Sequence, residues 1–182
     1  MNAPYVSTFL GNRFYLTRPH IDDVAIEDIA HGLAYQCRFN GQTNAFYSVA
    51  QHSLMVMDLV PPDHRFAALL HDAAEAYLGD MVKPLKNLFP EFSVIEARVM
   101  AIIGEKFGLD LTHLALSIKQ ADLVALATEK RDLMPHSTEP WSYLAEVEPL
   151  PHAIAPMSPE KAKEAFLVAY QRFSADISRD QR

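Results

Sequence analysis

The 182-residue sequence contains a single cysteine, Cys37, and no apolar run that approaches the roughly 18 residues of a membrane span. One cysteine excludes an internal disulfide and is typical of a reducing compartment. The N-terminus shows no basic stretch followed by an apolar one, so we expect no signal peptide, no membrane partner and a cytoplasmic location. Basic residues are in the minority, 16 against 23 acidic ones, and the net charge is -7. This charge disfavours binding to a nucleic-acid polymer and is compatible only with a local basic pocket for a small anion.

Apolar residues make up 49% of the chain, enough for one domain, residues 1–182, with a sizeable core. They recur at helical spacing, and we therefore predict an all-α core over about residues 22–134. A small N-terminal β-hairpin is expected over residues 8–16, with Phe9-Leu10 in its first strand and Gly11-Asn12 as its turn. The helices of the core are expected from Asp22 or Asp23 onward, then over residues 48–60, 63–78, 92–107 and 114–133, with an irregular stretch over residues 81–90.

Prolines concentrate after this core, where six of the twelve lie within residues 135–159. We expect a long surface loop over residues 135–157, which could act as a lid or contain a short helix. A last helix is predicted over about residues 159–177, because a serine and a proline at its start supply a cap and a suitable first helical residue. Trp141 and Tyr143 lie in the proline-rich loop, and we expect them to pack rather than to form a platform for a base.

The chain is organised around the stretch from Ala68 to Asp80, which carries His71, Asp72 and Glu75. On a continuous helix, Glu75 shares a face with His71 and Asp72, because it follows them by four and three positions. Burial of a carboxylate without a partner is costly, so a His-Asp pair directed into the core favours a nearby divalent cation. The alternative is a buried histidine that hydrogen-bonds to its neighbour, with Glu75 on a solvated edge.

Three of the predicted helices carry groups that bind metals: His52, the His71-Asp72 pair, and Asp122. Asp122 interrupts an apolar run and is expected to be buried, so its charge needs a partner or a metal. Two imidazoles and two carboxylates form a mixed nitrogen and oxygen set. Such a set suits Mn, Co, Fe, Ni or Zn better than it suits a thiolate-rich structural zinc site.

The order of these groups, one histidine, then a His-Asp pair, then a distant aspartate, resembles the HD-domain metal-dependent phosphohydrolases. The match is with the bacterial HD-domain 5'-deoxynucleotidases in particular, and together with the second group of motifs given below it covers about residues 9–134. Its motifs are Tyr47-Ser48-Val49-Ala50-Gln51-His52-Ser53, Leu69-Leu70-His71-Asp72-Ala73-Ala74-Glu75, Gly79-Asp80, Pro84-Leu85-Lys86 and Lys119-Gln120-Ala121-Asp122. Further motifs, Ile26-Glu27-Asp28-Ile29-Ala30-His31 and Cys37-Arg38-Phe39, are similar to a related group of bacterial HD hydrolases.

The resemblance implies an HD-domain helical bundle with one divalent metal ion, which could be Mn, Co, Fe, Ni, Zn or Mg. The implied ligands are His52, His71, Asp72 and Asp122. It also implies a nucleotide as the small-molecule substrate, a nucleoside 5'-monophosphate whose phosphate sits on the metal. Members of the family often form dimers, so a homodimer is compatible with the resemblance.

Substrate contacts are implied ahead of the first metal histidine. Arg38 and Phe39 occupy places similar to those of a basic and an aromatic residue that contact the substrate in the nucleotidases. Those enzymes usually carry tryptophan where this chain has Phe39. Lys86 is a third candidate for substrate binding, with a solvated lysine as its alternative. The alternative for Arg38 is an ion pair, and we expect Glu129 to pair with Arg38 or with Arg131.

Two further acids are the candidate catalytic residues. Glu75 lies one turn beyond His71 and Asp72, so we expect it to act as a general acid or base and not to bind the metal. The resemblance places Asp80 near the sugar, where it would disfavour a 2'-hydroxyl group.

These expectations favour a phosphohydrolase that removes phosphate from a nucleotide, with a metal that polarises the phosphoryl oxygens and lowers the pKa of a bound water. One alternative is cleavage of a phosphodiester or pyrophosphate in a cyclic nucleotide or an alarmone. Another is a nucleotide sensor that keeps the fold and the metal but is catalytically silent. A purely structural helical adaptor would not explain four chelating groups on three helices.

Overall fold

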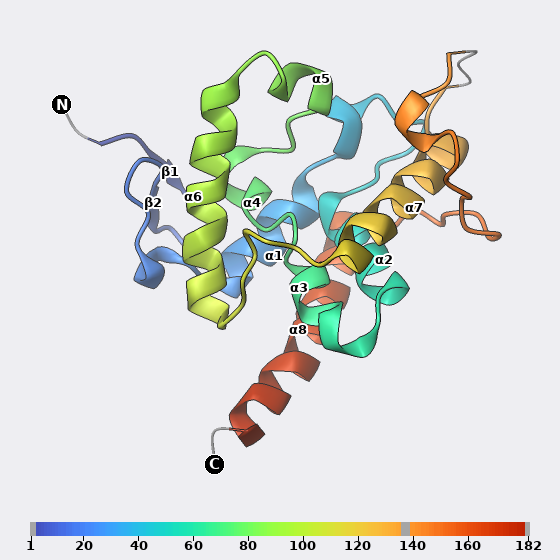
Figure 1. The fold of residues 1–182 in the computed structure, drawn as a ribbon. Coiled ribbons are helices and arrows are strands. Elements are labelled where there is room, and N and C mark those ends of the chain that lie inside the picture. Colours follow the sequence, from blue (N-terminus) through green and yellow to red (C-terminus); the bar gives the residue numbers. More distant parts are fainter. Residues whose placement is uncertain (1–2, 136–138, 181–182) are drawn as a thin grey trace.

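The computed structural model describes residues 3–135 and 139–180, the last seven of them by their backbone alone. It is mostly helical, with one small antiparallel sheet at an edge of the helical body (Figure 1). The strands are β1 (Tyr5–Ser7) and β2 (Arg13–Tyr15). The α-helices are α1 (Ile26–Tyr35), α2 (Val49–Leu59), α3 (Arg65–Leu69), α4 (Glu75–Leu78), α5 (Lys83–Lys86), α6 (Pro90–Phe107), α7 (Leu116–Leu133) and α8 (Pro159–Asp180). Short 3₁₀ helices are η1 (Ile21–Asp23), η2 (Arg38–Gly41), η3 (Pro62–His64) and η4 (Ser142–Leu144).

Helix α2 lies at the centre of the helical body and packs against α1, α3, α7 and α8. Ser48 caps its N-terminus, because the side chain accepts a hydrogen bond from the Gln51 amide at 3.1 Å. Most of its first seven residues and the Val56-Met57 pair are buried. A side chain on the first turns of α2 therefore faces the interior, and His52 is one of these.

The hairpin is confirmed, but its first strand is β1 and not the predicted Phe9-Leu10. Phe9 instead lies in the turn, where its ring stacks on His31 of α1 with centroids 3.9 Å apart. Phe14 of β2 stacks on Tyr77 of α4 at 3.8 Å. Two strands alone are marginally stable, and these two ring contacts, together with a hydrogen bond from the Leu10 amide to Asp28 of α1 at 2.8 Å, attach the hairpin to the helices.

The continuous helix predicted over residues 63–78 is wrong, because the chain forms η3 and α3, then a series of turns, then α4. In an unbroken α-helix, the Ala68 carbonyl would accept from the Asp72 amide. Here it accepts from the amide of His71 at 3.4 Å and from His71 Nδ1 at 2.8 Å. The tighter pattern continues, since the Glu75 amide donates to the Asp72 carbonyl at 3.0 Å. The His71 side chain thus competes with the helix for a backbone acceptor.

Helices α1 and α4 approach each other closely, which holds the turns between α3 and α4 in place. A Cβ atom at Gly32 of α1 would lie 2.8 Å from the carbonyl oxygen of Ala76. Only glycine fits this contact without a shift of the backbone. The glycine at position 32 therefore permits α1 and α4 to pack this closely.

The other helix boundaries differ less from those predicted from the sequence. Helix α1 begins at Ile26, after η1, and not at the predicted Asp22 or Asp23 caps. Helix α5 lies in the stretch that we predicted to be irregular, and η4 is the short helix that the proline-rich loop could contain. Among the described residues, no helix combines the length and the apolar character that crossing a membrane requires.

Candidate metal centre

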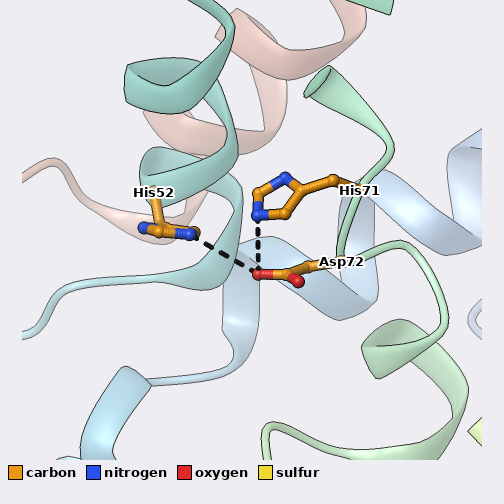
Figure 2. Close-up of side chains that lie close together, drawn as sticks. All are labelled: His52, His71 and Asp72. Atoms are coloured by element: carbon orange, nitrogen blue, oxygen red, sulfur yellow. Dashed lines mark ion pairs between the residues drawn. The ribbon is translucent and has the colours of Figure 1, made fainter. Parts of the chain in front are cut away.

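Three side chains from two separate parts of the chain converge in the interior (Figure 2). His52 lies on α2, and His71 and Asp72 lie in the turns between α3 and α4. Asp72 Oδ2 lies 3.2 Å from Nε2 of His71 and 3.5 Å from Nε2 of His52. One ligand atom from each residue falls within 4.8 Å of the others, so this group could hold a metal ion.

The two histidines direct their Nε2 atoms only toward the carboxylates of Asp72 and Asp122. Both residues are buried, and neither Nε2 atom has a hydrogen-bond partner among the described residues. Nδ1 of His71 donates to the Ala68 carbonyl, which leaves a lone pair on Nε2. A buried polar atom without a partner is costly in a structural role, whereas an available imidazole lone pair is what a metal ligand requires. The group therefore fits a metal ion.

Asp122 of α7 lies beside this group. Its Oδ1 atom is 3.1 Å from Nε2 of His52, but the residue is not part of the three-residue group. The expectation that Asp122 is buried is wrong, because 42% of its side chain is exposed and the residue lines a cavity. The predicted fourth ligand therefore lines the same cavity as Asp72.

Glu129, fully buried on α7, connects two of the predicted site residues. Its Oε1 atom lies 2.7 Å from Nδ1 of His52, and its Oε2 atom accepts from Nε of Arg38 at 3.2 Å. A second Arg38 nitrogen lies 3.2 Å from the same oxygen. The predicted ion pair of Glu129 is therefore made with Arg38 and not with Arg131. The sequence did not indicate that the same carboxylate also holds His52.

The charges of this network stabilise one another. Burial opposes a charge on His52, but the carboxylates of Glu129 and Asp122 raise its pKa to about 9. Burial also opposes ionisation of Glu129, yet Arg38 and His52 hold its pKa below the usual range. The pKa of Asp72 is likewise lowered, because the two imidazoles outweigh its burial. Because the surrounding carboxylates favour a proton on Nε2 of His52, they also favour a metal cation at the same place.

Glu75 begins α4 next to the cluster and is buried, with Oε2 unpaired among the described residues. Burial, together with the charges of Asp72 and Asp80, raises the pKa of its carboxyl group. Gln36 holds both ends of α4, since Nε2 donates to the Glu75 carbonyl at 2.6 Å and Oε1 accepts from the Asp80 amide at 2.8 Å. Sequence reasoning missed Gln36, whose only signal is its position just ahead of the Cys37-Arg38-Phe39 motif.

A cavity of about 590 Å³ lies beside the cluster, and Asp72 is the member of the three-residue group that lines it. Arg38 and Phe39 form one side of it, and the carboxylates of Asp72, Glu75, Asp80 and Asp122 lie along it. Phe39 and Asn40 have φ angles of +56° and +53°, a left-handed conformation that is costly for residues with side chains. Strain of this kind concentrates at functional sites.

Lys86 lines a second, smaller cavity of about 270 Å³. His71, Asp72 and Glu75 line this cavity as well. The Lys86 ammonium group donates to Glu96 Oε1 at 2.7 Å, and the side chain is only partly exposed. Lys86 is therefore neither a fully solvated lysine nor a free cation.

Fold and site together define a mostly helical protein with a small antiparallel sheet and a His-Asp group that could hold a metal ion. The chain is 38% identical over 174 residues to the uncharacterized protein YfdR of Escherichia coli, which covers 93% of this chain and 96% of YfdR. It is 40% identical over 136 residues to an uncharacterized protein of Rhodobacter capsulatus, covering 68% and 69% of the two chains. The chain belongs to the family of YfdR. No family model matches the sequence.

Proposed function

We propose that the protein is an HD-domain metal-dependent phosphohydrolase that releases phosphate from a nucleotide, a nucleoside or deoxynucleoside 5'-monophosphate. The observation that carries the proposal is the convergence of His52 and His71 on Asp72, with both Nε2 atoms directed at carboxylates, beside a cavity that Asp72 lines. The motifs around these residues, which resemble those of the HD-domain nucleotidases, support the same function.

The residues that would hold the metal ion are His52, His71 and Asp72, with Asp122 as a fourth ligand. A divalent ion bound there supplies a Lewis acid for the phosphoryl oxygens and lowers the pKa of a coordinated water. The neighbouring Glu129 carboxylate fixes the ring of His52, so one metal-facing nitrogen is oriented before any ligand arrives.

Arg38 would bind the phosphate. Its guanidinium group is largely buried and lines the cavity. Two of the guanidinium nitrogen atoms lie 3.2 Å from Oε2 of Glu129, which holds the group in place. Because burial is offset by the charges of Glu129, Asp80 and Asp72, the pKa of Arg38 is raised and its positive charge is secure. A preorganised guanidinium with further N–H donors matches the oxygens of a phosphate group.

Glu75 would supply a proton to the leaving group. Hydrolysis of a phosphomonoester leaves an oxygen on the nucleoside that must gain a proton. The raised pKa of Glu75 favours its protonated carboxyl, which is the form that can donate. Asp80 lines the same cavity and would contact the sugar.

The proposal is tested by release of free phosphate from a panel of nucleotides with Mn²⁺, Co²⁺, Mg²⁺ and Zn²⁺. The panel contains nucleoside and deoxynucleoside monophosphates, di- and triphosphates, cyclic nucleotides and a guanosine alarmone, with Asp72→Ala as the control for a contaminating phosphatase. We expect phosphate from the monophosphates, and none from the control. Turnover restricted to cyclic or pyrophosphate substrates, or no turnover with any metal, would overturn the proposal.

A further inference from the structure

Three aromatic side chains line the cavity at a distance from the metal-compatible group. Phe39 comes from η2, whereas Trp141 and Tyr143 come from the proline-rich segment that we expected only to pack. The Trp141 and Tyr143 rings stack with centroids 5.9 Å apart, and Phe39 lies 6.3 Å from Trp141. Nearly half of the Tyr143 surface, 47%, is still exposed. We refer to these three residues as the aromatic wall.

A cation lies over each ring of the aromatic wall, from a neighbouring helix for Trp141 and Tyr143 and from the preceding residue for Phe39. Nζ of Lys130 on α7 lies 4.8 Å from the Trp141 centroid, and Nζ of Lys83 on α5 lies 5.2 Å from that of Tyr143. The Arg38 guanidinium lies 5.2 Å from the Phe39 centroid. Cation–π contacts of this length are attractive, so the rings are positioned by α5, α7 and η2 rather than by the segment alone.

The chain that follows the rings is tied to the helical body. Thr128 and Asp132 of α7 accept hydrogen bonds from backbone amides within residues 150–154, at 2.9 and 2.8 Å. Gln51 of α2, one position before His52, donates to the Ala155 carbonyl at 2.9 Å. These anchors hold residues 150–155 against the two helices that carry His52 and Asp122.

The cavity is too large for a phosphate group alone. Its volume of about 590 Å³ lies within the range of about 300–1,000 Å³ that is typical of sites for whole small molecules. Besides the aromatic wall, apolar side chains such as Leu123 and Leu126 line it, and Asn40 and Gln42 add amide groups. Flat rings, apolar contacts and a few hydrogen-bonding groups are suited to a planar heterocycle, because bases stack on aromatic side chains and present donors and acceptors at their edges.

We propose that the proline-rich segment, through Trp141 and Tyr143, binds the base of the nucleotide and so selects the leaving group of the reaction. The proposal deepens the function proposed above and rests on it. Arg38 links the two halves of the site, since one guanidinium faces both the Phe39 ring and the Asp72 carboxylate. A phosphate at Arg38 would place the rest of the substrate along the aromatic wall.

Binding is tested without hydrolysis, because Trp141 is the single tryptophan of the chain and its fluorescence reports on this cavity alone. The probes are 2'-deoxyadenosine and thymidine, which carry no phosphate, with ribose as the control. We expect both nucleosides to quench the emission saturably and ribose to leave it unchanged. Tyr143→Leu should weaken the binding about tenfold, and Tyr5→Ala, an exposed aromatic on the hairpin, should not. Absence of saturable quenching overturns the proposal.

Selection is tested by kcat/KM for a nucleoside monophosphate against ribose 5-phosphate, which has the same reacting group and no base. Trp141→Leu and Tyr143→Leu should lower kcat/KM for the nucleotide about 10- to 100-fold and leave ribose 5-phosphate unchanged, while Trp141→Phe retains most of the nucleotide rate. Equal losses on both substrates would assign the rings a structural role and overturn the proposal. If nucleosides quench but no phosphomonoester is cleaved, the base site stands and the hydrolytic function fails.

Discussion

Oε1 of Glu129 lies 2.7 Å from Nδ1 of His52, and the other oxygen of the same carboxylate accepts from Arg38. One fully buried acid therefore orients a predicted metal ligand and a predicted phosphate-binding residue at the same time. Because Nδ1 is engaged, Nε2 is the nitrogen that His52 presents to Asp72. Metal affinity and phosphate binding should both depend on Glu129, although it contacts neither ligand directly.

Glu129→Gln is expected to lower the affinity for Mn²⁺ by about 10- to 100-fold, because groups that orient a metal-binding histidine contribute about this much. The variant should also unfold at a lower temperature, since Arg38 loses the carboxylate that offsets its burial. Calorimetric titration with Mn²⁺ measures the first effect, with the exposed Glu105→Gln as the control. Equal Mn²⁺ affinities in the two variants would show that Glu129 does not support metal binding.

His71→Ala and Asp72→Ala should each abolish stoichiometric metal in the purified protein. Metal binds the folded state, so wild type should lose thermal stability on chelation, by about 2–3 kcal/mol if the metal is near 100 times its Kd. The two variants should not respond to the chelator. His113, on the surface, provides the matched control His113→Ala. Elemental analysis that finds the same metal content in all four proteins would contradict the ligand assignment.

Glu75→Gln should leave the metal content intact and lower kcat about 10²–10⁴-fold, because the amide cannot exchange a proton with the leaving oxygen. The matched control is Glu96→Gln, which removes a carboxyl from the smaller cavity where Glu75 also lies. We expect the control to retain most of its activity. If both variants lose activity alike, the effect comes from the charge balance around Lys86 and not from proton transfer.

Arg38→Ala is expected to raise KM or lower kcat/KM, but it would also leave Glu129 without its cation. Arg38→Lys is the sharper test, because it keeps the charge and removes the planar fork of donors. We expect kcat/KM to fall about tenfold or more with unchanged metal content, and no change in Arg131→Lys. Unchanged kinetics in Arg38→Lys would show that Arg38 only forms the ion pair with Glu129 and does not bind the phosphate.

Asp132 should make stability depend on pH through the anchored proline-rich segment. Hydrogen bonds from Arg131 and from the Ile154 amide lower the pKa of its carboxyl. The resulting stabilisation is complete above the unfolded pKa of about 3.9 and disappears as the pH falls through the lower folded pKa. Asp132→Asn should therefore have a lower Tm than wild type near neutral pH, and the difference should close at acid pH. Asp58→Asn, on an exposed position of α2, should show no difference at either pH.

The positions of the long helices could be predicted from the sequence, because helix formation follows short-range apolar spacing and local stop signals. Helices α2, α6 and α7 lie within two residues of their predicted ranges. The family resemblance implied that His52, His71, Asp72 and Asp122 would meet, and the structure brings the first three into one group with Asp122 beside it. These features depend on neighbours along the chain or on motifs with recognisable spacing.

Only the tertiary structure decided the features that depend on contacts across the chain. Glu129 could pair with Arg38 or Arg131 by sequence, and the packing of α2 against α7 brings it to Arg38, 91 positions away. The side chain of His71 breaks a helix that local spacing favours, because it takes the Ala68 carbonyl. Trp141 lines the cavity next to Lys130 of α7, whose Nζ lies 4.8 Å from the ring centroid, and side chains of α7 and α2 bind the backbone of the chain that follows it, at Leu150 and Ala155. Local spacing contains no information on such contacts, since their energies arise only when distant elements pack.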